Sequence, residues 1–164
     1  MTCPNYSPFF PRSGTSFVTH SFLLQSGKWD VKGHFSAKNQ SPSTVQGFMD
    51  ITWKEDNWFK IVSELSFDKQ TQPQIKSKFR GHLDIERKSY TYVLQHSLLG
   101  NIEGEGWIGS QSIVQYYWIV AGNQHRTGFD TFSRLSEDNY ALTSVVLERH
   151  NLNSTMEATL KHLI

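Results

Sequence analysis

The stretch Ser26-Gly27-Lys28-Trp29-Asp30-Val31-Lys32-Gly33-His34-Phe35 decides the fold class of this chain. Its apolar and charged residues would fall on opposite faces of an extended strand, with Trp29, Val31, Gly33 and Phe35 on one face and Lys28, Asp30, Lys32 and His34 on the other. Alternation of this kind is typical of a strand that buries one face. The stretch therefore predicts the first strand of an antiparallel β-protein.

Similar alternating segments continue to the C-terminus, separated by short runs of turn residues. The clearest is 75–86, because a helix would scatter its charges around the circumference. Ten strands are expected, at about 27–35, 44–53, 58–67, 75–86, 89–99, 102–109, 112–121, 124–135, 140–150 and 154–163. Short, regularly spaced strands predict a meandering barrel or sandwich. Closure into an up-and-down barrel is favoured because it removes exposed sheet edges.

Glycines inside the expected strands support closure, since barrel corners and close backbone approaches are the places that tolerate them. They are Gly33, Gly47, Gly81, Gly104, Gly106, Gly109 and Gly128. Residues 1–16 hold three of the five prolines and are expected to form an irregular lead-in. Residues 17–164 are expected to form one barrel domain, which begins with a short turn over 17–24.

Composition excludes several function classes. A net charge of +1 over 164 residues gives no single-sign field for nucleic acid. The single cysteine, Cys3, excludes an internal disulfide and a cysteine-based structural zinc site. No apolar run reaches the length of a membrane span, and the N-terminus lacks a secretory signal. A cytoplasmic protein is expected. Aromatic residues make up 13% of the chain, and they either fill the core or line a cavity.

Gly27-Lys28-Trp29 at the start of the first strand, followed by an all-β meander, resembles the calycin superfamily of lipocalins, fatty-acid-binding proteins and their bacterial cytoplasmic relatives. The ten-strand count is more similar to the fatty-acid-binding and nitrobindin-like branch. Haem-binding members of that branch have Gly-x-Trp-x-Gly-x-Gly, whereas Val31 stands here at the middle glycine. The resemblance implies a ligand inside the barrel.

Three arginines in the late strands, Arg126, Arg134 and Arg149, are candidate ligand contacts. In barrels that bind fatty acids, inward arginines and a tyrosine hold the ligand carboxylate, as guanidinium geometry suggests. Arg126 shares a strand face with Asp130 and Phe132. An arginine–aspartate pair or plain surface charge is the alternative. The other candidate ligand-binding residues are Tyr92, His96, Trp107 and Tyr117.

The seven histidines show no metal-ligand spacing, so no metal site is expected. If the barrel held haem, His162 or His150 would be the axial ligand, because imidazole is a usual haem donor. The glycine-rich run 100–106 is acidic, precedes no helix and is not a phosphate loop. No catalytic residues can be assigned, since no nucleophile-elbow motif occurs.

The run Ile113–Val120 is apolar on both faces, which predicts that its outer face is covered by the N-terminal segment or by a second copy in a homodimer. The function expected first is non-enzymatic binding of a small apolar or amphipathic ligand inside the barrel. The alternatives are an isomerase, cyclase or chromophore lyase acting on such a ligand, a haem-binding protein, and an assembly factor with a filled interior. The cofactor is left open.

Overall fold

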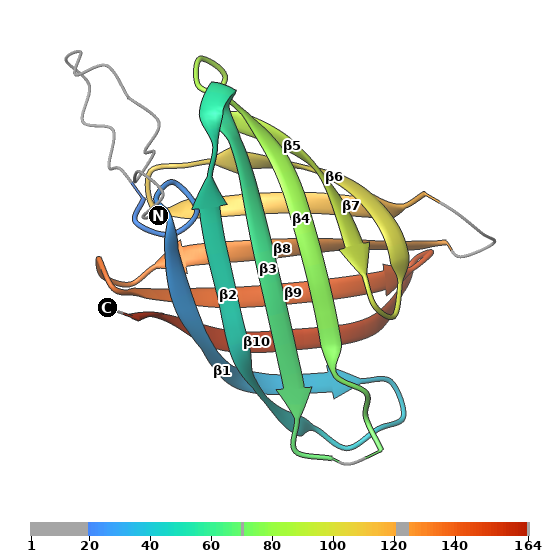
Figure 1. Ribbon diagram of the computed structural model, residues 1–164. Coiled ribbons are helices and arrows are strands. Elements are labelled where there is room, and N and C mark those ends of the chain that lie inside the picture. Colours follow the sequence, from blue (N-terminus) through green and yellow to red (C-terminus); the bar gives the residue numbers. More distant parts are fainter. Residues whose placement is uncertain (1–19, 70, 121–124, 164) are drawn as a thin grey trace.

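A computed structural model describes residues 20–69, 71–120 and 125–163, and Figure 1 shows a closed barrel of antiparallel strands. Each strand pairs with the next in sequence, and β1 also pairs with β10. The strands are β1 Gly27–Ala37, β2 Ser43–Trp53, β3 Trp58–Phe67, β4 Ile75–Asp84, β5 Ser89–His96, β6 Gly100–Ile108, β7 Ser112–Ile119, β8 Arg126–Arg134, β9 Asn139–Glu148 and β10 Asn151–Leu163. The predicted all-β, ten-stranded, up-and-down barrel is confirmed. The expected lead-in over 1–16 lies outside the described residues.

The alternation read from the sequence separates inner from outer residues. In β1, Trp29 and Val31 are fully buried, while Lys28, Lys32 and His34 are exposed. The one helical element among the described residues is a single 3₁₀ turn at Glu55–Asn57 between β2 and β3. None of the helical structure in the described part of the chain is long and apolar enough to cross a membrane.

Two glycines in β1 and β2 allow neighbouring backbones to approach closely. A Cβ on Gly33 would lie 2.0 Å from the Glu157 carbonyl oxygen, and one on Gly47 would lie 1.8 Å from the Glu64 carbonyl oxygen. Backbone atoms at these distances leave no room for a side chain. These two glycines thus mark close backbone approaches of the kind predicted, whereas Gly109 lies just beyond the end of β6.

Four other strand glycines make room for inward aromatic rings. Each is the direct cross-strand partner of the ring that covers it, in the pairs Phe59–Gly81, Tyr92–Gly104, Tyr90–Gly106 and Tyr117–Gly128. A glycine leaves a gap on the pleated surface, and a ring from the neighbouring strand fills that gap. The large aromatic content of the chain is therefore accommodated inside a narrow barrel.

Residues 20–24 fold as a turn across one end of the barrel, as expected for this segment, and close it; they are called the plug below. Phe22 packs edge-on against Trp29, with ring centroids 5.4 Å apart, and in a tilted arrangement against Phe132 at 4.7 Å. Trp53 Nε1 donates a 2.7 Å hydrogen bond to the Leu23 carbonyl oxygen. The plug is thus attached to β1, β2 and β8 by side-chain contacts.

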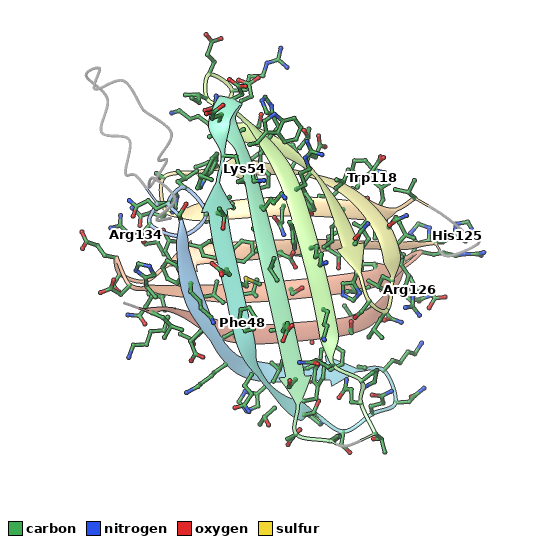
Figure 2. The ribbon with its side chains drawn as sticks, viewed as in Figure 1. Phe48, Lys54, Trp118, His125, Arg126 and Arg134 are labelled. Atoms are coloured by element: carbon green, nitrogen blue, oxygen red, sulfur yellow. The ribbon has the colours of Figure 1, made fainter. Side chains whose placement is uncertain are left out.

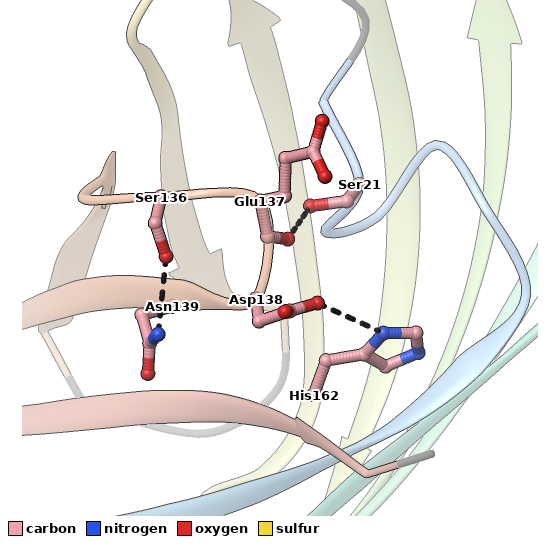
Figure 3. Close-up of polar contacts among 6 residues, drawn as sticks. All are labelled: Ser21, Ser136, Glu137, Asp138, Asn139 and His162. Atoms are coloured by element: carbon pink, nitrogen blue, oxygen red, sulfur yellow. Dashed lines mark hydrogen bonds and ion pairs between the residues drawn. The ribbon is translucent and has the colours of Figure 1, made fainter.

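His20 fixes the other side of the plug. Its Nε2 donates to the Gly109 carbonyl oxygen at 2.7 Å, so its Nδ1 accepts from the Tyr140 hydroxyl at 2.7 Å. Figure 3 shows the neighbouring contacts with the β8–β9 turn, where Ser21 Oγ donates to the Glu137 carbonyl oxygen and His162 lies 3.9 Å from Asp138. The contacts of His20 and Ser21 hold the plug against the barrel rim.

Candidate ligand-binding site

A cavity of about 240 Å³ occupies the barrel interior between the plug and the opposite end. Phe22 and Leu23 of the plug form its floor, and most of its wall is apolar. Leu98, which is half exposed, lines it at the other end, so the cavity reaches the surface there. Its volume lies just below the range usual for small-molecule sites, about 300–1,000 Å³.

A chain of polar side chains crosses the cavity wall. The Tyr90 hydroxyl donates to Gln115 Oε1 at 2.8 Å, and Gln115 Nε2 donates to Asp130 Oδ2 at 2.7 Å. Ser144 Oγ donates to the other Asp130 oxygen at 2.5 Å. These residues come from β5, β7, β8 and β9. Together they present one carboxyl group to a mostly apolar space.

Strand register places this chain of side chains. Gln115 is the direct partner of Asp130, and Asp130 is the direct partner of Ser144. Tyr90 and Gln115 both pair with Gly106 on β6, which lies between them. Because Gly106 has no side chain, the Tyr90 ring passes over it and reaches Gln115. A single glycine therefore allows the contact between β5 and β7.

Burial raises the pKa of Asp130, and the hydrogen bonds from Ser144 and Gln115 oppose that rise. None of the ion pairs found in the described residues involves Asp130. Burial, together with the Asp130 charge, also raises the pKa of Tyr117, which lines the same cavity and stays protonated. The polar part of the cavity therefore combines phenol donors with one carboxyl group.

His96 lies at the open end of the cavity. Its Nδ1 accepts hydrogen bonds from the amides of Leu98 and Leu99, each 3.1 Å long, which shape the β5–β6 turn. Burial lowers the pKa of His96 to about 4. A second proton on this ring would sit on Nδ1, directly facing two amide donors. The ring is therefore held neutral at the cavity opening.

The free energy of unfolding is expected to decrease as the pH is lowered, because of His96. Its folded pKa of about 4 lies below the unfolded value of about 6.5, so the unfolded chain takes up the proton first. Between these two values the free energy of unfolding should decrease by about 2–3 kcal/mol through this group. His96→Asn keeps an acceptor for both amides and removes the titration. Urea unfolding from neutral pH to about pH 4 should therefore show a smaller loss for the variant.

Other groups titrate equally in both proteins, including His20, whose pKa burial also lowers. The difference between the two curves thus isolates His96. Curves that run parallel through the whole range would contradict the assignment.

The three predicted arginines lie in different places. Arg126 and Arg134 stand at opposite ends of β8 (Figure 2), and only Arg126 lines the cavity. Arg134 lies at the plugged end, where its charge acts on His20 and Tyr140. Arg149 is exposed in the turn after β9 with φ of 55°, so its expected position in a strand facing the interior is wrong. The strand ends at Glu148, because the chain reverses there into β10.

Of the other predicted ligand contacts, some line the cavity and some do not. Tyr117 lines the cavity, as does His96. Tyr92 points inward and is buried, but it does not line the cavity, and its hydroxyl has no partner among the described residues. Trp107 is 48% exposed on the outer face, so its expected place on the cavity wall is wrong. Alternation assigns it outward because its neighbours Gly106 and Ile108 point inward.

The two histidines proposed as haem ligands do not fit that role. His150 is exposed in the β9–β10 turn. His162 stacks on Trp29 at 4.8 Å at the plugged end, outside the cavity. In the described part of the chain, no three His, Cys, Asp or Glu side chains gather as a metal site. Neither predicted axial ligand is therefore placed to hold haem in the barrel.

The predicted apolar outer face of 113–120 is present. Val114, Tyr116 and Trp118 alternate along β7 and are 37–41% exposed. Trp107 on β6 and Phe129 on β8, both exposed, continue this face across the neighbouring strands, since they pair with Val114 and Tyr116. Tyr116 and Trp118 are in ring contact at 6.0 Å.

No protein-family model matches this chain, and no curated protein matches it in sequence. Solved structures do match. The S-type phycobiliprotein lyase CPES from Guillardia theta is 14% identical with a TM-score of 0.60, over 85% of this chain and 88% of that chain. At this identity the likeness shows the fold alone.

Two barrels bound to DFHBI also match. The redesigned β-barrel mFAP1 is 15% identical with a TM-score of 0.47, over 89% of this chain and 99% of that chain. EF1p2_mFAP2b is 13% identical with a TM-score of 0.49, over 90% of this chain and 100% of that chain. The chain is thus a ten-stranded barrel with a phycobiliprotein lyase among its structural neighbours.

Proposed function

We propose that this protein is a calycin-type barrel that binds a small apolar or amphipathic ligand in its interior. The observation that supports the proposal is the cavity of about 240 Å³, which is closed by the plug and reaches the surface at Leu98. Apolar walls with a few convergent polar groups are characteristic of ligand sites. The proposal includes a cytoplasmic location, which stays a prediction from the sequence.

The polar groups suit an amphipathic ligand. Arg126 lines the open end, and Asp130 with its hydrogen-bond partners lies farther in. Residues 126 and 130 are four positions apart on β8, a separation of about 13 Å along an extended strand. A ligand that fills the apolar space would therefore meet polar groups at two different depths.

A larger side chain inside the cavity should weaken ligand binding. Ser77 on β4 is buried and lines the cavity, so a leucine there would project into the ligand space. Prodan, a neutral dye whose emission depends on polarity, should bind the wild-type protein saturably. Ser77→Leu should weaken this binding by about tenfold or more, as measured by fluorescence titration.

Thr52→Leu is the matched control, because Thr52 is exposed on the outer face of β2. It adds the same side chain outside the cavity and should leave binding unchanged. Equal titration curves for all three proteins would place the dye elsewhere and count against the cavity.

An enzyme that acts on the ligand is the second candidate. The observation that favours it is Asp130, a cavity carboxyl group whose pKa burial raises, because such groups are suited to proton transfer. A structural neighbour is named as a lyase, which agrees with this candidate. Native mass spectrometry of the purified protein, with an absorption spectrum, would identify a co-purified ligand. Recovery of that ligand with altered mass after incubation would favour the enzyme.

We also propose a homodimer through the outer face of β7. Its support is the row of exposed apolar side chains on β6, β7 and β8, since contiguous exposed apolar patches mark interaction sites.

A further inference from the structure

Among the described residues, Asp130 is the one acidic residue that lines the cavity. A carboxylate has about four acceptor positions. Gln115 and Ser144 occupy two of them with hydrogen bonds of 2.7 and 2.5 Å. Since the residue also lines the cavity, the remaining acceptor capacity faces the ligand space.

The protein supplies no counterion to this group. No ion pair in the described residues reaches Asp130, although Arg126 lies on the same strand. Taking a carboxylate out of water without a cation is costly, and a well-placed bound cation offsets part of that cost. The cavity therefore offers a site for positive charge that no ion pair among the described residues occupies.

The hydrogen bonds around Asp130 determine that this site accepts a donor from the ligand. The Tyr90 hydroxyl donates to Gln115 Oε1, so the Gln115 amide must turn its NH₂ group toward Asp130. The other Asp130 oxygen receives the Ser144 hydroxyl. Both protein partners are donors, and a ligand acceptor placed here would meet the lone pairs of Asp130. A ligand donor would find them free.

We propose that Asp130 selects, among apolar ligands of suitable size, those that carry a protonated amine whose N–H groups donate to its carboxylate. This inference rests on the proposed function, because it names the ligand chemistry of the same cavity. It reverses the expectation of an anionic ligand held by the late-strand arginines, of which only Arg126 lines the cavity.

Three ligands that share one compact apolar cage test the inference: 1-aminoadamantane, 1-adamantanemethanol and 1-adamantanecarboxylate. Isothermal titration calorimetry of the full chain at neutral pH should rank them amine, then alcohol, then acid. The dissociation constant of the amine should be lower than that of the alcohol by about tenfold or more, because hydrogen bonds between charged groups are stronger than those between neutral groups. This comparison uses the wild-type protein and does not depend on a variant that folds.

Asp130→Asn then isolates the residue. Its amide oxygen can accept from Gln115, and its NH₂ can donate to Ser144, whose hydroxyl rotates, so the hydrogen bonds are kept and the charge is lost. The variant should lose the preference for the amine and keep the affinity for the alcohol within about threefold. Asp50→Asn, on the exposed outer face of β2, should behave as wild type.

The outcomes separate the two proposals. If the alcohol and the amine bind equally, or if Asp130→Asn keeps the preference, the inference about Asp130 is overturned while binding in the cavity stands. If none of the three ligands nor prodan binds the wild-type protein, the proposed function fails and the inference fails with it.

Discussion

Trp29→Ala is expected to lower the free energy of unfolding by about 3–5 kcal/mol, the range for truncation of a buried tryptophan. Trp29 has no exposed surface and joins the plug to the barrel. Its ring meets Phe22 at 5.4 Å, Tyr140 at 5.6 Å and His162 at 4.8 Å. Removal of the ring leaves a void at the closed end, and the residues around it belong to β9, β10 and the plug. Urea unfolding followed by circular dichroism measures the loss.

Trp29→Phe is the matched control. It keeps an aromatic ring and removes an Nε1 group that is buried without a partner among the described residues. An unsatisfied buried donor is itself destabilising. The phenylalanine variant should therefore lose less than about 2 kcal/mol. Equal losses for the two variants would mean that the ring contacts contribute little to stability.

Gly47→Ala is expected to lower the free energy of unfolding by about 3 kcal/mol or more, at the upper end of the range for overpacked cores. The added Cβ would lie 1.8 Å from the Glu64 carbonyl oxygen and 2.9 Å from Leu65 Cα. Both belong to the backbone of β3, which is hydrogen-bonded to β2 along its length. No side-chain rotation can relieve the contact, so the two strands must separate locally. Thermal and urea unfolding should both show the loss.

Gly100→Ala serves as the control for Gly47→Ala. Nothing lies within 4 Å of the added Cβ there, but the residue has φ of 79°. Gly100→Ala should lower the free energy of unfolding only through backbone strain, by about 1–2 kcal/mol. A loss for Gly47→Ala no greater than that for Gly100→Ala would contradict the close approach of β2 and β3.

Much of the fold was predictable because alternation is a local property. A strand that buries one face must place its apolar residues at every second position, as β1 and β4 do. The strand ends were harder to predict, because a turn depends on the length of the partner strand as well as on local residues. Arg149 illustrates this point: the segment 140–150 reads as one strand, but the chain turns after Glu148.

The candidate site was predicted only in part. Alternation placed Arg126 and Asp130 on one face, and both line the cavity, as do the candidate ligand contacts Tyr117 and His96. It did not single out Asp130 or Gln115, because a lone polar residue in a strand gives no sign of what lies across the barrel. The signal that was present is the polar residue between buried positions, as in Gly128-Phe129-Asp130-Thr131-Phe132, where Gly128 and Phe132 are buried.

The sequence by itself determined the strand number, the antiparallel order and the face of most residues, since each follows from a period of two and short connections. Only the tertiary structure decided which end of the barrel is closed, because the plug is held by Trp29, Trp53 and Tyr140 from three different strands. It also decided the cavity chemistry. Register brings Tyr90, Gln115, Asp130 and Ser144 into one hydrogen-bonded chain, and register is set by pairing along the whole barrel rather than by any single segment.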